Sequence, residues 1–457
     1  MTYCLRMVGV KLAILGLVVA VGCTKTNAAA FCADGTCSDP NFAYCDVDGA
    51  ASGEPGMCIA VTCTPGVVKQ CHDGAAMTCN AGGNGYEDVA CDLGCADART
   101  AHCKYLQPKY LPDICDSSAT AGPLVLTSMG TIDPNLDNTC TGGVVQQTGA
   151  PSICVIRNTT ISITADARIV VAGLATMTGR SIAFVADGDL DIAGTLDLSA
   201  HVSLNGPGGG AIASQTAGSI NGSVVGAMGG AGGATTGGAG ATGTIQSGGS
   251  DGGALNGGPA LMNPALLAAF YGGASTIRGT GETSDTFFAG GGGAAILVSC
   301  RGSISVSGVV NAGGGGGAGG AVALFPFPAT GGGAGGNIVI QANRISVVGK
   351  IFANGGSGGS GWHNDRSQGA RGQDGLASVS PALTPGAVDG AGKGGDGGYA
   401  NAGPSDGRHP TQDGAGPGGG GGSVGFLQTY TPNGVAPTLT PAEVSPPFQP
   451  NGVVELR

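Results

Sequence analysis

Aliphatic side chains alternate with polar or small ones in four segments of this chain. In the clearest, SIAFVADGDLDIAGTLDLS at 181–199, large apolar residues hold every second position within each group: Ile182, Phe184, Leu190, Ile192, Leu196 and Leu198. Successive side chains of a strand point to opposite faces, so this spacing predicts three short strands that bury one ridge. Asp189, Asp191 and Asp197 fall on the outward face.

The same pattern recurs in copies that begin at Ile161, Ile296 and Ile338. Ile182 follows Ile161 by 21 positions, and Ile338 follows Ile296 by 42, which is twice 21. In the copy at 296 the alternation places Ile296 and Val298 inward. A repeating unit of about 20 residues with three short strands is typical of a solenoid, in which each unit stacks on its neighbours.

A single copy cannot stay folded by itself. Its larger inward side chains contribute roughly 1.5 to 3 kcal/mol each, whereas ordering the backbone costs roughly 1 to 2 kcal/mol per residue. Copies stacked about 4.8 Å apart would share hydrogen bonds and an aliphatic interior. We therefore expect an all-β fold: a parallel β-helix over residues 156–430 with glycine-rich excursions, preceded by a small disulfide-rich module.

Composition narrows the classes of function. The 457 residues include 93 glycines, with 4% aromatic and 11% charged residues, which is unlike an ordinary globular enzyme. The formal net charge is -11 and no basic run occurs, so nucleic acid is not expected as a partner. The glycines lack the strict every-third spacing of collagen.

Glycine-rich tracts lie between the copies, at about 206–293, 313–336 and 355–422. Two conformations fit them. In one, the tracts are flexible loops that leave one corner of the solenoid. In the other, they are left-handed helices of three residues per turn, like polyproline II, which pack closely because glycine has no side chain. The scarcity of polar side chains and the absence of charge runs favour partial order.

The first 22 residues have the pattern of a bacterial export signal. Arg6 and Lys11 precede an apolar core at 12–21, which is too short to span a bilayer comfortably. Residues 1–22 are therefore expected to act as a signal peptide.

The signal ends in Ala20-Val21-Gly22-Cys23, which resembles a lipobox. The resemblance implies lipidation of Cys23, a tether at 23–31, and anchoring in the membrane through acyl chains. Thr24 rather than Asp after the cysteine implies release to the outer membrane. The alternative is an ordinary signal peptide cleaved near 28–30, which would give a secreted protein.

Thirteen cysteines lie between positions 32 and 154, a density that predicts disulfides in an exported chain. They are Cys32, Cys37, Cys45, Cys58, Cys63, Cys71, Cys79, Cys91, Cys95, Cys103, Cys115, Cys140 and Cys154. No C-x-x-C pair occurs, so neither a metal nor another cofactor is expected. The module spans 32–115, divides near Val61 into groups of four and six cysteines, and is followed by a transition segment at 116–155.

Cys300 is the only cysteine beyond residue 154. It could close a bridge to one of Cys115, Cys140 and Cys154. Its inward position in the repeat favours instead a buried free thiol that acts as a small hydrophobic side chain.

The strand pattern occurs for the last time at Val424, Phe426 and Gln428, which predicts the closing strand. After Tyr430 the chain is rich in proline. Proline cannot donate to a ladder, so we expect 431–457 to form an extended tail or cap without further pairing.

One group of acidic residues could carry catalysis. Asp187, Asp189 and Asp191 lie on one outward side, as the carboxylates of a β-helix polysaccharide lyase or hydrolase would. The aligned positions in later copies include Ser305 and Ser346, so no row of carboxylates continues. Solvated acidic residues on an exposed strand are the better interpretation.

Trp362 is the only tryptophan and sits in the glycine-rich stretch GGSGWHNDRSQG. An exposed indole there could stack on a glycan. The favoured alternative is that the ring plugs the end of a glycine tract, because an exposed aromatic side chain is costly without a partner.

Two resemblances bear on location. The stretch GAMGGAGGATTGGAGATG at 226–243 resembles the glycine-rich repeats of mycobacterial PE_PGRS surface proteins, and the layout of the whole chain resembles myxobacterial cell-surface lipoproteins. We expect a non-catalytic envelope lipoprotein with a structural or adhesive role, facing the periplasm or the surface, with glycans or other surface proteins as partners. The alternatives are a glycan-active enzyme and a passive coat protein.

Overall fold

The computed structural model describes residues 30–210, 269–276 and 289–457, apart from short gaps. The gaps are at 33, 43, 48, 50–51, 53, 61–62, 98–99, 120, 175–178, 203, 323–325, 328, 364–366, 385, 388 and 413–414. The chain forms two compact units, Met1–Lys104 and Tyr105–Arg457. The described regular structure of both is almost entirely β, as the alternation predicts.

The first unit consists of small antiparallel pairs held by disulfides. Its strands are β1 (Tyr44–Asp46) with β2 (Met57–Ile59), the sheet of β3 (Val68–His72), β4 (Ala75–Cys79) and β5 (Tyr86–Ala90), and β6 (Cys95–Ala96) with β7 (His102–Cys103). Its disulfides are Cys32–Cys45, Cys37–Cys58, Cys63–Cys79, Cys71–Cys95 and Cys91–Cys103. None of these bridges crosses Val61, so the division into four and six cysteines is confirmed.

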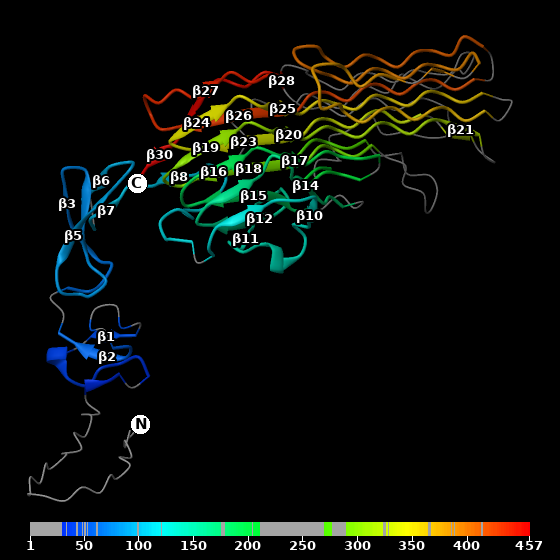
Figure 1. Ribbon diagram of the computed structural model, residues 1–457. Helices are drawn as coiled ribbons and strands as arrows, with labels where there is room; N and C mark the ends of the chain where they lie inside the picture. Colours follow the sequence, from blue (N-terminus) through cyan, green and yellow to red (C-terminus); the bar gives the residue numbers. More distant parts are fainter. Residues whose placement is uncertain are drawn as a thin grey trace, which may run out of the picture. The chain divides into compact units, whose positions relative to one another are not determined.

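Three sheets of mainly parallel strands organise the second unit (Figure 1). The chain visits each sheet once in a group of three strands, which we call a round, and successive rounds pair in parallel. The five rounds are β12–β14 (Ile153–Asn158, Ile161–Ile163, Arg168–Val171), β15–β17 (Ser181–Ala186, Leu190–Ile192, Thr195–Asp197), β18–β20 (Ala294–Ser299, Ser303–Val306, Val309–Asn311), β23–β25 (Asn337–Gln341, Arg344–Val347, Lys350–Phe352) and β26–β28 (Phe426–Thr431, Thr438–Leu439, Glu443–Ser445).

Shorter strands stand at both ends of these sheets. β9 (Leu124–Leu126) and β10 (Gly130–Ile132) pair in parallel with β13 and β14 of the first round, and β11 (Val144–Val145) pairs antiparallel with β12. At the other end β29 (Gly452–Val453) extends the sheet of β26.

Aliphatic side chains from successive rounds form rows inside the sheets. One row is Ile161, Leu190, Ile304 and Ile345, and another is Ile169, Leu196, Val310 and Ile351. All eight are buried in one cluster. The inward positions predicted for these strands are therefore confirmed, and the solvent-side row of Asp191, Ser305 and Ser346 alternates with them as expected.

The predicted period of 21 residues is wrong. Ile161 pairs with Leu190 and not with Ile182, because it belongs to the second strand of its round. Ile304 pairs directly with Ile345, so the spacing between these copies is one round and not two. The glycine tracts between rounds differ in length, and the distance along the chain therefore carries no fixed repeat.

The inward face of β18 also differs from the prediction. Ala295 and Leu297 lie in the main core, whereas Ile296 and Val298 point to the opposite face of the sheet. The sequence of this strand, AAILVS, is apolar at almost every position, and both of its faces are buried. In such a strand, alternation of apolar and polar residues cannot show which side chains face the main core.

A second buried cluster covers that opposite face. It joins Ile296, Val298 and Val339 of the sheet to Leu106, Leu111 and Cys115, with Phe270 beside them. β8 (Leu106–Gln107) pairs with β30 (Glu455–Leu456), so the first and last segments of this unit meet there. Residues 105–115, expected in the Cys-rich module, thus pack as a cover on the second unit.

The proline-rich end of the chain continues the sheets, contrary to the expected unpaired tail. β27 and β28 pair in parallel with β24 and β25. Pro437, Pro441 and Pro446 stand just outside these short strands, so the ladder needs no hydrogen bond from them. In β26 Leu427 faces the core, which is the opposite phase from the one predicted with Phe426 and Gln428 inward.

The glycine tracts are ordered where the structure describes them. All seven amides of 355–361 donate backbone hydrogen bonds, and the direction repeats every third residue. Gly355, Gly358 and Gly361 bond to one tract, Gly356 and Gly359 to a second, and Ser357 and Ser360 to a third. A repeat of three is the geometry of polyproline II, so close-packed helices, rather than flexible loops, are observed.

We call these segments glycine helices. They lie side by side beyond the strands in Figure 1, and hydrogen bonds spaced by three residues connect 312–320, 329–336, 353–362, 368–375, 390–398 and 415–425. Such spacing suits the tracts because a polyproline II helix has no internal hydrogen bonds, so its amides bond to neighbouring segments.

Glycine is required in these helices by the closeness of their backbones. A Cβ added to Gly358 would lie 2.1 Å from the Gly419 carbonyl oxygen, and one added to Gly359 would lie 2.0 Å from that of Ala318. No described glycine of 353–362 has a positive φ, whereas the turn residue Gly210 has a φ of +76°. The requirement is thus for space and not for left-handed backbone.

Candidate functional site

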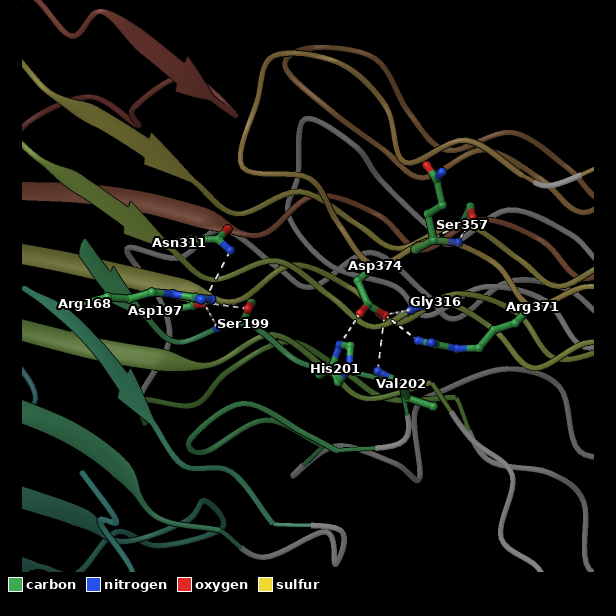
Figure 2. A network of polar contacts seen from close by, with 11 residues as sticks. Arg168, Asp197, Ser199, His201, Val202, Asn311, Gly316, Ser357, Arg371 and Asp374 are labelled. Carbon is green, nitrogen blue, oxygen red and sulfur yellow. Dashed lines mark hydrogen bonds and ion pairs between the residues drawn. The ribbon is translucent and has the colours of Figure 1, made fainter. Parts of the chain in front are cut away.

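Polar side chains gather where the strands pass into the glycine helices (Figure 2). Asp197, the last residue of β17, accepts hydrogen bonds from the Arg168 guanidinium at 2.8 Å and from the Ser199 hydroxyl at 2.6 Å. The side-chain amide of Asn311 donates to it at 3.4 Å. Arg168, Asp197 and Asn311 belong to three successive rounds, so this carboxylate ties the strand ends of those rounds together.

Asp374 is the second centre of this junction (Figure 2). Its Oδ2 lies 2.6 Å from His201 Nδ1, and its Oδ1 accepts from Arg371 at 2.6 Å and from the Gly316 amide at 2.8 Å. The Val202 amide also donates to Oδ1. One carboxylate therefore connects the exit of the second round to two glycine helices, and its oxygens are occupied by donors of the protein.

The aspartates considered for catalysis also hold the rounds together. Asp187 pairs with Arg157 at 2.9 Å, and their side chains are only 14% and 10% exposed. Asp189 accepts hydrogen bonds from the amide and the hydroxyl of Ser303, both at 2.8 Å. Acid and base catalysis by carboxylates needs two groups that are free to face a substrate. Two of the three carboxylates considered for this alternative, Asp187 and Asp189, instead bond to other segments of the chain.

Trp362 lies inside the glycine helices and is only 3% exposed. A Cβ on Gly416 would approach its ring to 2.5 Å, so the indole packs directly on a glycine backbone. In this position the ring offers no open face to a sugar. This placement matches the alternative in which Trp362 plugs the end of a tract.

The second unit contains two disulfides whose pairing could not be deduced from the spacing of the cysteines in the sequence. Cys140 pairs with Cys154, and Cys115 pairs with Cys300 across 185 residues. The expectation of a free thiol at Cys300 is therefore wrong. Cys300 faces the covered outer side of its sheet and not the main core, and this places it against the segment that carries Cys115.

The described cysteines do not form a metal site. The Sγ atoms of Cys32, Cys37 and Cys58 lie within 4.8 Å of one another. All three are in disulfides, and a disulfide sulfur is not the thiolate that metals bind. Cys23, the predicted lipidation site, lies outside the described residues.

Aromatic residues hold the cover over the outer sheet face. The Tyr110 ring lies 5.5 Å from that of Phe270, and burial, together with nearby Tyr430, raises the pKa of Tyr110 well above its usual range. The Gln341 side chain accepts from the Lys109 amide at 2.7 Å and donates to its carbonyl at 3.2 Å. These contacts position the cover and leave the phenol neutral.

Sequence reasoning missed a polar row inside the glycine helices. Asn354, Ser357 and Ser360 are fully buried and bond to the backbones of neighbouring tracts. The Ser357 hydroxyl accepts from the Gln373 amide at 2.8 Å and donates to the Leu383 carbonyl at 3.1 Å. Their spacing of three residues was the signal that could have identified the helix type.

Comparisons with family models, with curated proteins and with solved structures find no match to this chain. Among the described residues, no helix is long and apolar enough to cross a membrane. The functional argument therefore rests on the geometry of the rounds and of the glycine helices.

Proposed function

We propose that the second unit is a parallel β-helix extended by a bundle of glycine helices, and that the protein is a non-catalytic structural or adhesive lipoprotein of the bacterial envelope. The hydrogen-bonded glycine helix at 353–362 carries this proposal. Its seven consecutive donors are distributed over three neighbours. Such a bundle is a stiff support that needs little apolar side-chain area.

The location depends on the amino-terminal sequence. Cys23 as a lipid anchor and Thr24 after it support the outer membrane, with a secreted protein as the alternative. The resemblance to myxobacterial surface lipoproteins supports the same location. Protease treatment of intact cells tests it: fragments of the second unit should be released from a surface protein, and none from one that faces the periplasm.

The composition limits the partners to be tested. Glycans or other surface proteins suit a projecting bundle, because many weak contacts on neighbouring copies would add by avidity. A net charge of -11 disfavours nucleic acid. Cells that lack the protein should attach more weakly to surfaces and to one another. Unchanged attachment and cohesion would reject the adhesive role.

One observation favours a passive coat as the second candidate. Trp362, the side chain best suited to stack on a sugar, is buried. If the protein is a coat without a specific ligand, cells that lack it should attach as well as cells that have it. Such cells should instead lose resistance to surface-active agents.

The glycan-active enzyme is the weakest alternative, because Asp187 and Asp189 are engaged by Arg157 and Ser303. Assays against pectin, alginate and peptidoglycan should give no turnover. Turnover that disappears in the Asp189→Asn variant would overturn the non-catalytic proposal.

A further inference from the structure

The two ends of the cover at 105–115 both attach to one residue of the third round. The Leu106 amide donates to the Cys300 carbonyl at 2.9 Å, and Cys115 forms its disulfide with the same residue. The Arg301 guanidinium adds a hydrogen bond to the Cys115 carbonyl at 3.2 Å. The cover therefore leads from the first residues of the second unit directly to the end of β18.

β18 is the central strand of its sheet. It is the fourth of seven strands in the order β11, β12, β15, β18, β23, β26 and β29, and it pairs in parallel with β15 on one side and with β23 on the other. Both of its faces are buried. Cys300 follows this strand directly, so a pull on Cys300 is resisted by the rounds on both sides of it.

The chain that follows the cover enters the sheets at an edge instead. β9 and β10 are the last strands in their sheets, and among the described strands β9 pairs only with β13. Two polar contacts precede them: the Arg157 guanidinium donates to the Ser117 carbonyl, and the Asp187 carboxylate accepts from the Ala119 amide. In a solenoid each repeat contacts only its neighbours. A pull on this part of the chain would therefore detach short edge strands one after another.

The Cys115–Cys300 disulfide removes that part of the chain from the path of a pull. The bridge spans 185 residues, and the first two rounds and β18 all lie within this span. A disulfide is a covalent bond, whereas the strands are held by hydrogen bonds and apolar contacts that are individually weak. Tension that arrives through the cover therefore passes to Cys300 and omits 116–299.

We propose that the cover and its disulfide form a strap, which transmits tension from the first unit to the third round and protects the first two rounds from unravelling. This inference deepens the structural or adhesive role proposed above and rests on it. Tension arises when a lipid anchor holds the amino-terminal side of the chain and a partner holds the glycine helices. All six glycine helices follow Cys300 along the chain, so the strap lies on the path between anchor and bundle.

Single-molecule pulling on the full exported chain tests the strap. One handle is attached at the amino-terminal side of the first unit. The other is attached through an azide-bearing residue in place of Gly386, where a Cβ meets nothing within 4 Å. Handles of this kind leave the native disulfides intact, because they need no added thiol.

The order and the force of the unfolding events give the result. In the unaltered protein no event should release 116–299. In the double variant Cys115→Ala/Cys300→Ala an additional first event should appear, at a lower force than any event in the unaltered protein. It should lengthen the chain by about 600 Å, since the 185 residues extend by roughly 3.3 Å each.

The double variant Cys140→Ala/Cys154→Ala is the matched control. It removes the other disulfide of the second unit, and that disulfide lies inside the protected segment. With the strap in place, its removal should change neither the force nor the length of any event. A general loss of stability, in contrast, would lower the forces in both double variants.

Two results would overturn the proposal. One is a Cys115→Ala/Cys300→Ala chain in which 116–299 yields only together with the third round and at an unchanged force, which would show that the noncovalent contacts suffice. The other is an equal loss of force in the Cys140→Ala/Cys154→Ala control. Unchanged attachment of cells that lack the protein would reject the adhesive role and leave these forces as they are, so the two failures are distinguishable.

Discussion

The stacked strands and the glycine helices of the second unit are stabilised by different interactions. Burial of aliphatic side chains stabilises the strands, and backbone hydrogen bonds stabilise the glycine helices. The strands bury aliphatic rows such as Ile161, Leu190, Ile304 and Ile345, each worth roughly 1.5 to 3 kcal/mol. The glycine helices have almost no side chains to bury and gain roughly 0.5 to 1.5 kcal/mol per net hydrogen bond. Ordering glycine also costs more entropy than ordering other residues.

The difference indicates that the strands support the bundle. Four of the six glycine helices begin or end at a strand, as 353–362 does after β25 and 415–425 does before β26. Asp197 and Asp374 fasten the junction. Damage to the aliphatic rows should therefore weaken both regions, whereas damage to a glycine helix should open the bundle and leave the strands paired.

Gly358→Val should give the largest effect. The Cβ alone would lie 2.1 Å from the Gly419 carbonyl oxygen, and hydrogen bonds to neighbouring tracts hold both backbones in place. We expect the bundle to lose more than about 4 kcal/mol of stability, enough to open it. Limited proteolysis should then cut within 353–425 while the β-sheet signal in circular dichroism persists. Gly386→Val is the control, since a Cβ there meets nothing within 4 Å.

Leu297→Ala should destabilise both regions together. Leu297 is fully buried in the main core, and removing its side chain should cost about 3 kcal/mol. Thermal unfolding should show strands and bundle melting at a lower temperature in one transition. Val309→Ala, at a half-buried position, should cost less than about 1 kcal/mol. A bundle that melts alone in Leu297→Ala would contradict the dependence proposed here.

Removing the Cys115–Cys300 disulfide should cost about 2 to 4 kcal/mol, because it closes 185 residues of chain. The double variant to alanine avoids leaving a free thiol, and urea unfolding measures the change. In the unaltered protein, mass spectrometry without reduction should find no free thiol at Cys300. A reactive thiol at Cys300 would contradict the disulfide and would show that Cys300 is a buried free cysteine.

Ser357→Ala should give the smallest effect, about 1 to 2 kcal/mol. The change leaves the Gln373 amide and the Leu383 carbonyl without their hydroxyl partner at a partly buried position. Faster hydrogen exchange at Gln373 would report it. Ser380→Ala, at an exposed position, should change nothing.

Alternation was sufficient to find the strands of the second, third and fourth rounds and two of the first and, where one face meets solvent, to choose the inward side. Leu190, Ile304 and Ile345 follow it because aspartate or serine separates them from the next apolar residue. β18 did not, because its outer face is covered by 105–115. The partner of Cys300 was open for the same reason, since a covering segment leaves no periodic signal in the strand that it covers.

The glycine helices could be only half predicted. Polyproline II was one of two conformations that fitted the tracts. Glycine has no side chain, so a run of glycines does not show which residues of the three-residue repeat lie on the same face of the helix. The few residues other than glycine show it, because they recur at a spacing of three, as Lys393, Asp396 and Tyr399 do. The Asp374 junction depends on tertiary contacts between distant segments, which no local pattern encodes.

Hydrogen exchange at single-residue resolution over 355–361 tests the central claim most directly. If the helix at 353–362 is bonded on all sides, all seven amides should be protected about as strongly as those of β24 in the neighbouring sheet. Exchange of these amides at the rate of an unstructured chain would show that the tracts are loops and would contradict the account.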